Sequence, residues 1–264
     1  MNIQLDGIRL HALSDGNGAA VVLLHGFPLT HAIWNAQIES LAKTAHVVAP
    51  DLRGMGKSDA PPGPYLMENL AGDIAALLDA LQMPRASIFG HSMGGFAALA
   101  FFRMFSERVS SLGLICSRVD ADTNDGVRMR LELADRIERE GMQPAVDFYI
   151  ARLLRPRGSA ELVNTVAHLI RTQAPAGAAA LLRGAAARAS SEDLLEDIDV
   201  PTLIVCGSED TISPPDYNRS VAARIQNSEM KVIERSAHLP MLENSDAMCD
   251  ALKGFLRRSG SIAM

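Results

Sequence analysis

Short apolar runs alternate with helical patterns over the first 118 residues of the chain. Four of these runs have the length and composition of buried strands, at residues 21–24, 46–49, 86–89 and 109–115. Residues 33–41 and 66–81 carry apolar side chains at helical spacing, and Asp6-Gly7 offers a turn between two short N-terminal strands. Because strands that alternate with helices are typical of parallel sheets, we predict an α/β fold with a mostly parallel central sheet flanked by helices.

The pattern becomes wholly helical in the middle of the chain. No convincing strand lies between residues 127 and 189, where helical patterns cover 128–140, 144–154 and 160–171 and an alanine-rich stretch covers 174–189. Strand–helix alternation then resumes, with apolar runs at 202–206 and 230–233 and helical patterns near 214–225 and 241–256. We therefore predict a core domain of residues 1–118 and 190–264, with residues 119–189 inserted as a helical cap that is not an independent domain.

Composition and charge narrow the class of protein. The 264 residues are 48% hydrophobic and carry a net charge of −6, so the surface as a whole does not attract nucleic acid or anionic membranes. The N-terminus lacks the pattern of a signal peptide, and no apolar run has the ~20 residues of a membrane helix. The three cysteines, Cys116, Cys206 and Cys249, are widely spaced and imply no disulfide framework. We expect a cytoplasmic protein without nucleic-acid or membrane partners, and leave its oligomeric state open.

The segment Gly90-His91-Ser92-Met93-Gly94 is the main candidate for chemistry. It follows the apolar run 86–89 and precedes the helical pattern 96–105, the strand–turn–helix context that gives a G-x-S-x-G motif its meaning. At such a turn the serine has a strained backbone, and glycine is needed on both sides because larger residues would clash. The turn holds the Ser92 hydroxyl at the carboxyl end of a strand, where a parallel sheet opens its crevice.

Candidates for a base and an acid follow the last two predicted strands. A serine hydroxyl becomes nucleophilic when a base takes its proton, and that base is usually a histidine oriented by a carboxylate. Asp210 follows the run 202–206, with Glu209 beside it as a competing acid, and His238 follows the run 230–233. Parallel strands end on one side of a sheet, so both groups are expected on the edge that carries Ser92. The chain order Ser92, Asp210, His238 is that of the α/β hydrolases.

Five segments carry a wider resemblance. Together they resemble the α/β-hydrolase superfamily, and within it the group of small capped serine esterases and lactonases. The chain is similar to 3-oxoadipate enol-lactonases, carboxylesterases and cofactor-free perhydrolases. The resemblance covers nearly the whole chain outside the helical insertion. One departure is Met55, where family members often carry histidine at a position that is not catalytic. The segments are His25-Gly26-Phe27-Pro28, residues 51–59, Gly90 to Gly95, Gly207 with Asp210, and Ala237-His238-Leu239-Pro240.

The resemblance implies an oxyanion hole made of the backbone N–H groups of Phe27 and Met93. Pro28, the neighbour of Phe27, has no N–H to give, and two such donors stabilise the charge that develops on the substrate oxygen. The side chains of Phe27, Met93 and Trp34 are candidates for substrate binding, with a core position as the alternative for Trp34. No pair among the other histidines has metal-ligand spacing with nearby cysteines or carboxylates, so we expect neither a metal nor a cofactor.

These features favour a carboxylic ester hydrolase with a Ser92–His238–Asp210 triad, which cleaves a small ester or lactone through an acyl-enzyme on Ser92. A serine at the turn excludes the dehalogenases and epoxide hydrolases of this fold, which use aspartate there. Carbon–carbon bond hydrolysis of ring-cleavage products and perhydrolase activity remain as alternatives, and a ligand receptor built on this fold is the alternative outside catalysis. Arginines of the insertion are expected in solvent rather than at a substrate carboxylate.

Overall fold

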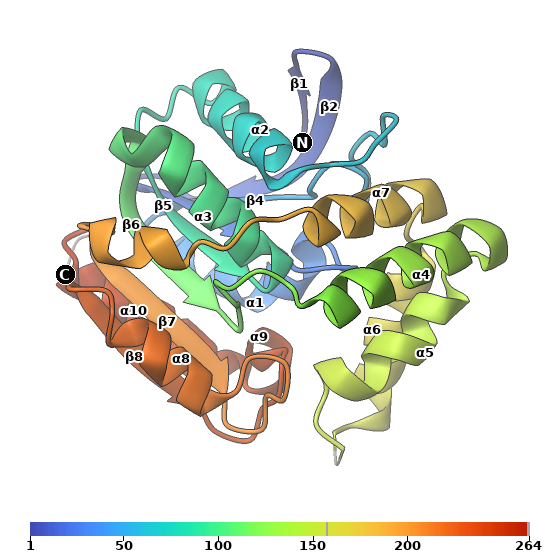
Figure 1. Cartoon of the computed structure of the whole chain (residues 1–264). Coiled ribbons are helices and arrows are strands. Elements are labelled where there is room, and N and C mark those ends of the chain that lie inside the picture. The colour runs from blue at the N-terminus through green and yellow to red at the C-terminus, as the bar shows by residue number, and fades with distance from the viewer. Residues whose placement is uncertain (157, 263–264) are drawn as a thin grey trace.

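An eight-stranded sheet forms the centre of the structure, a computed structural model that describes residues 1–156 and 158–262 (Figure 1). The strands lie in the order β1-β2-β4-β3-β5-β6-β7-β8. The pairs β1–β2 and β2–β4 are antiparallel and all later pairs are parallel, which confirms the predicted mostly parallel sheet. The strands are β1 (Asn2–Leu5), β2 (Ile8–Asp15), β3 (Ala20–Leu24), β4 (His46–Pro50), β5 (Ala86–His91), β6 (Val109–Ile115), β7 (Thr202–Gly207) and β8 (Ser228–Ile233).

Helices cover both faces of this sheet. Figure 1 shows α3 and α8 in front of the sheet and α1 and α10 behind it. On the rear face, Phe89 of β5 packs edge-on against Phe255 of α10, with ring centroids 5.9 Å apart. None of the described helices is long and apolar enough to cross a membrane. The helices outside the segment between β6 and β7 are α1 (Asn35–Leu41), α2 (Met67–Ala80), α3 (Met93–Phe105), α8 (Pro215–Ala222), α9 (Pro240–Glu243) and α10 (Ser245–Arg258). Three short 3-10 helices are η1 (His31–Trp34), η2 (Ser106–Arg108) and η3 (Glu192–Asp197).

Four helices between β6 and β7 gather beside the sheet and are called the helical block below (Figure 1). Their positions agree with the helical patterns of the sequence, and the described residues of 119–189 contain no strand. Within the block, α7 packs along α4, and α5 packs against both α4 and α6. The four helices are α4 (Asn124–Glu140), α5 (Gln143–Leu153), α6 (Ala160–Arg171) and α7 (Pro175–Ala186).

The alanine-rich helix α7 ties the helical block to the loop before α2. Small side chains let its backbone approach that loop closely: a Cβ on Gly184 would lie 1.6 Å from the carbonyl oxygen of Tyr65. The Tyr65 N–H in turn donates to the carbonyl oxygen of Ala180 at 3.1 Å. Composition alone leaves open whether this stretch packs closely or leaves a wide cavity, and the structure shows close packing.

Two helices differ from their predicted bounds. The pattern over 241–256 predicts one helix, but the chain breaks at Asn244, whose backbone is not helical (φ −147°, ψ 66°). The Asn244 side-chain amide donates to the carbonyl oxygen of Glu234 at 2.9 Å, so a tertiary contact favours the break between α9 and α10. At the other difference, α4 begins at Asn124 because the Thr123 hydroxyl accepts the N–H of Gly126 and caps the helix.

The close contact of Gly184 with Tyr65 predicts that two Gly→Ala substitutions change the free energy of unfolding in opposite directions. Gly184→Ala forces backbone apart and is expected to destabilise the protein by about 1–3 kcal/mol. Gly72→Ala, within α2 and with no atom within 4 Å of the added Cβ, is expected to stabilise it by about 0.5–1 kcal/mol through helix propensity. Urea unfolding of the two variants and the wild type measures both effects. A Gly184→Ala variant as stable as wild type would contradict the packing described for α7.

Candidate active site

The turn between β5 and α3 fixes the position of Ser92. Its backbone has φ 52° and ψ −115°, which confirms the strained conformation predicted from the motif. The Ser92 N–H donates to the carbonyl oxygen of Ile115 at 2.9 Å, and the Ser117 hydroxyl donates to the Ser92 carbonyl oxygen at 2.9 Å. A Cβ on Gly90 would lie 2.2 Å from the carbonyl oxygen of Gly94, so the turn has no room for a larger residue there.

The loop after β3 lies directly against this turn. A Cβ on Gly26 would lie 2.5 Å from Nδ1 of His91 and 3.0 Å from Cβ of Ser92, so glycine is required for this approach. The buried ring of His25 shapes the loop, because its Nε2 accepts the N–H of Leu52 and its Nδ1 then donates to the carbonyl oxygen of Gly26, each at 2.9 Å. Burial lowers the pKa of His25, which favours this neutral ring.

The side chains of Phe27 and Met93 line a cavity of about 220 Å³ together with Ser92 and His238. We call it the central cavity. Met93 is also the first residue of α3, so its N–H is among those left free at a helix N-terminus. The third candidate for substrate binding, Trp34, is fully buried and lies outside the residues that line the cavity. The structure therefore places Trp34 in the core.

His238 and Asp210 form a buried pair. Nδ1 of His238 lies 2.8 Å from Oδ2 of Asp210, and both side chains are almost completely buried. The other carboxylate oxygen accepts the N–H groups of Ile212 and Ser213 at 2.8 and 3.1 Å. Burial alone raises the pKa of Asp210, but His238 and these N–H groups outweigh it and lower the pKa below its ordinary value. The ionised carboxylate fixes the tautomer of the imidazole and leaves Nε2 free to accept a proton. The competing acid, Glu209, is about half exposed.

Two further buried groups lie beside this pair. His91 donates from Nε2 to the carbonyl oxygen of His238 at 2.8 Å. Cys116, just after β6, has its Sγ within 4.8 Å of a side-chain oxygen of Asp210 and a ring nitrogen of His238. Burial raises the pKa of the Cys116 thiol well above its ordinary value, so the thiol stays protonated and is a poor metal ligand. The sequence predicts a small buried thiol at Cys116. The thiol lies near Asp210 because β6 and β7, the strands that precede these two residues, are parallel neighbours in the sheet.

The loop that carries His238 is fastened to the helical block. The N–H of His238 donates to the carbonyl oxygen of Leu153, the last residue of α5, at 3.1 Å. The carboxylate of Glu243 accepts the N–H of Ala237 at 2.7 Å and that of Arg155 at 3.0 Å, and its side chain is only 2% exposed. No pattern in the sequence distinguishes Glu243, because its role depends on two segments that meet only in the fold.

Three arginines also line the central cavity, although arginines of the insertion are expected in solvent. Arg118 follows β6, Arg130 belongs to α4 and Arg152 belongs to α5. The expectation is wrong for Arg130, whose side chain is only 21% exposed. Arg152 is exposed as expected although it also lines the cavity, and Arg118 precedes the insertion. The helical pattern of α4 does not distinguish a face directed to solvent from one directed to a cavity, because both carry charged residues.

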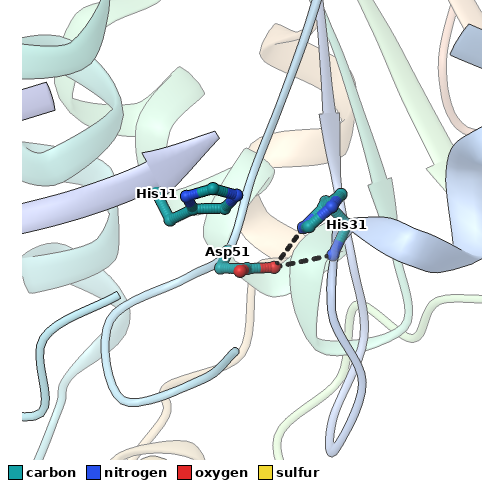
Figure 2. Close-up of side chains that lie close together, drawn as sticks. All are labelled: His11, His31 and Asp51. Carbon is teal, nitrogen blue, oxygen red and sulfur yellow. Dashed lines mark hydrogen bonds and ion pairs between the residues drawn. The ribbon is translucent and has the colours of Figure 1, made fainter. Parts of the chain in front are cut away.

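A second group of titratable side chains, His11, His31 and Asp51, meets outside the central cavity (Figure 2). One ligand atom from each lies within 4.8 Å of the others, although their spacing along the chain suggests no such cluster. Figure 2 shows Asp51 bonded to both the ring and the backbone nitrogen of His31, at 2.7 and 2.9 Å.

This donor set of two imidazoles and a carboxylate is of a kind that zinc accepts. However, the Asp51 carboxylate is already committed to the two N–H groups of His31 and to the N–H of Lys57 at 3.0 Å. Burial alone raises the pKa of Asp51, but these contacts lower it to about 2. Asp51 thus joins the loop that contains His31 to the loop after β4, and we interpret the cluster as a structural brace.

The burial of His91 predicts a loss of stability at acidic pH. Burial lowers the pKa of His91 from 6.5 to about 3, so between these values the unfolded chain takes up a proton that the folded chain does not. Stability is therefore lost as the pH falls, by about 2 kcal/mol between pH 7 and pH 5 from this group. His91→Gln keeps a donor for the carbonyl oxygen of His238 and is expected to remove this part of the pH dependence in urea unfolding. His168→Gln, an exposed position on α6, serves as the control. Equal slopes for wild type and His91→Gln would contradict the assignment.

Comparison with known proteins extends this description. Residues 19–245 match the family model described as alpha/beta hydrolase fold. The chain is 29% identical over 243 residues to 3-oxoadipate enol-lactonase 1 of Acinetobacter baylyi, covering 91% of this chain and 90% of the relative.

Two solved structures have a similar fold. A thermophilic esterase from Thermogutta terrifontis superposes with a TM-score of 0.95 at 34% identity, covering 98% of both chains. The enol-lactonase from Burkholderia xenovorans LB400 superposes with a TM-score of 0.88 at 25% identity, covering 97% of this chain and 99% of the other. The matched family model spans most of the chain, including the turn at Ser92 and the His238–Asp210 pair, and the chain belongs to the α/β-hydrolase family.

Proposed function

We propose that the chain is a serine hydrolase that cleaves a small carboxylic ester or lactone through an acyl-enzyme on Ser92. The observation that carries this proposal is the buried His238–Asp210 pair, whose histidine shares the wall of one small cavity with a serine on a strained turn. The similarity of the chain to esterases and to enol-lactonases also supports a carboxylic ester or lactone as the bond that is cleaved.

In the proposed reaction, Nε2 of His238 removes the Ser92 hydroxyl proton as the oxygen attacks the substrate carbonyl carbon. The backbone N–H groups of Phe27 and Met93 stabilise the negative oxygen of the tetrahedral intermediate, each lowering the barrier by about 3 kcal/mol. His238 then gives its proton to the leaving alcohol. In the second half of the reaction, His238 takes a proton from a water molecule that attacks the acyl-enzyme, and returns it to Ser92 as the acid is released. Asp210 stabilises the imidazolium that forms in each half of the reaction.

The helical block acts in this proposal as a cap, residues 119–189, on a core of residues 1–118 and 190–264. Support comes from the cavity wall, because α4 supplies Leu133 and α5 supplies Phe148 and Leu153 alongside Ser92 from the core. Apolar side chains from the cap exclude water from the reacting groups and limit the size of the substrate. A cavity of about 220 Å³ suits a small acyl group and a small alcohol.

Removal of the proposed nucleophile tests the function directly. Ser92→Ala is expected to lower kcat for p-nitrophenyl acetate by about 10³-fold or more, because the acyl-enzyme cannot form. A fluorophosphonate should add once to wild type and not to Ser92→Ala, as measured by intact-protein mass spectrometry. Ser208→Ala, in the loop after β7 on the same edge of the sheet, is the matched control and is expected to keep both properties.

Equal rates for wild type and Ser92→Ala would refute the serine mechanism. A panel of esters, lactones and ring-cleavage products, assayed with and without added hydrogen peroxide and analysed for acid, peroxyacid and carbon–carbon cleavage products, distinguishes ester hydrolysis from the alternatives. Preferential formation of either of the other two products would replace the ester and lactone assignment while leaving Ser92 as the nucleophile.

A further inference from the structure

One part of the central cavity is rich in arginine. Arg118, Arg130 and Arg152 line it, and the only acidic side chain among the described lining residues is Asp122. The remaining wall is mainly apolar. Such a distribution, with convergent charged groups in an otherwise apolar cavity, is typical of a site that orients one polar group of a ligand.

Two of these arginines are partly neutralised by aspartates. Arg118 forms two hydrogen bonds with Asp120, at 3.0 and 2.6 Å. Arg130 binds Asp122 through Nε and Nη2, which leaves Nη1 of Arg130 without a hydrogen-bond partner among the described residues. Both arginines therefore have a carboxylate partner, but Nη1 of Arg130 is a donor that no described residue uses.

Arg152 of the cavity wall and the neighbouring Arg188 form no hydrogen bond to an aspartate carboxylate among the described residues. Arg152 is exposed, lies over the ring of Phe148 at 4.1 Å from its centroid, and donates from Nη1 to the Phe148 carbonyl oxygen. It forms no ion pair with a described residue. The Arg188 side chain is 94% buried and stacks 3.8 Å from the centroid of the cavity residue Phe96. Its Nη2 donates to the carbonyl oxygen of Asp120, whereas its Nη1 donates to no described residue. Its nearest carboxylate is that of Asp122, at 3.7 Å.

This region thus contains four guanidinium groups, those of Arg118, Arg130, Arg152 and Arg188, against the two carboxylates of Asp120 and Asp122. Of the two excess positive charges, that of Arg152 is exposed, whereas that of Arg188 lies largely out of water, where an uncompensated charge is costly. Burial lowers the pKa of Arg188, as does the charge of Arg130, consistent with incomplete compensation. An anion in the cavity would supply the missing charge.

Tyr149 adds a neutral donor at the same place. Its ring lines the cavity and packs edge-on against Phe27, with centroids 5.5 Å apart. The hydroxyl has no hydrogen bond to a described residue, and burial raises its pKa although Arg130 acts in the opposite direction. The group stays protonated and can donate to an anion bound near Arg130.

We propose that Arg130, Arg152 and the Tyr149 hydroxyl bind a carboxylate of the substrate, so that the ester or lactone cleaved at Ser92 carries a second, ionised acid group. The identity of the cleaved bond depends on the proposed function, whereas the carboxylate site is inferred from the charges and the unused hydrogen-bond donors of the cavity. Charge-assisted hydrogen bonds of this kind are stronger than neutral ones and discriminate against substrates that lack the anion.

A pair of methyl esters of equal length tests the site. Monomethyl glutarate and methyl pentanoate differ by a carboxylate in place of a methyl group. Wild type is expected to have kcat/KM about tenfold or more higher for the anionic ester at low ionic strength, mainly through KM. Added salt should narrow that difference, because it screens partly exposed charges.

Two variants identify the groups that bind the anion. Arg130→Met and Tyr149→Phe are each expected to lower kcat/KM for monomethyl glutarate about tenfold while changing methyl pentanoate by about twofold at most. Arg128→Met is the matched control, since Arg128 lies on the same helix but is exposed and pairs with Asp125 and Glu132. Arg130→Lys keeps the charge and should restore part of the preference for the anionic ester.

Binding to Ser92→Ala, measured by calorimetry, separates this inference from the proposed function. That variant is expected to bind monomethyl glutarate about tenfold tighter than methyl pentanoate, whichever bond the wild-type enzyme cleaves. Equal binding of the two esters would overturn the carboxylate site. Equal losses for both esters in Arg130→Met and Tyr149→Phe would also overturn it, because they would indicate a structural role. Unchanged hydrolysis by Ser92→Ala would instead overturn the serine mechanism.

Discussion

The sharp turn at Ser92 is the constraint on which the rest of the proposed site depends. A serine with positive φ is unfavourable by itself and persists because the end of β6 holds its backbone, through the carbonyl oxygen of Ile115 and the hydroxyl of Ser117. The turn requires very close contacts, at Gly90 within the motif and at Gly26 in the loop after β3. The contact at Gly26 brings the loop after β3 directly against the turn that carries Ser92, although the two segments are distant in sequence.

Charge is distributed unevenly around this turn. Next to Ser92 one carboxylate, that of Asp210, is paired with one imidazole, and both side chains are almost completely buried. Farther along the cavity wall the balance is lost, because guanidinium groups outnumber carboxylates. The protein as a whole is acidic, so this local excess of positive charge opposes the average composition. A net charge computed over the chain is therefore a poor guide to what a cavity will attract.

The sequence predicts the sheet and the order of the proposed catalytic groups well, because both follow from local patterns. Apolar runs mark the strands, and the residue after each strand end lies on a known edge of the sheet. Features that depend on tertiary contacts escape this reasoning. The break at Asn244 follows from a bond to Glu234, and the arginine-rich wall follows from how α4 and α5 dock. Chain spacing likewise gives no sign that His11, His31 and Asp51 meet.

The attachment of the His238 loop to the helical block has a consequence for how substrates enter. The backbone of His238 is bonded to the end of α5, and Glu243 holds the neighbouring segments of core and block together. If the block lifted as a lid, these bonds would break and the histidine would lose part of its support at the same moment. Under the proposed mechanism, access by lifting the block and proton transfer by His238 therefore exclude each other, and reaction is expected only while the block is docked.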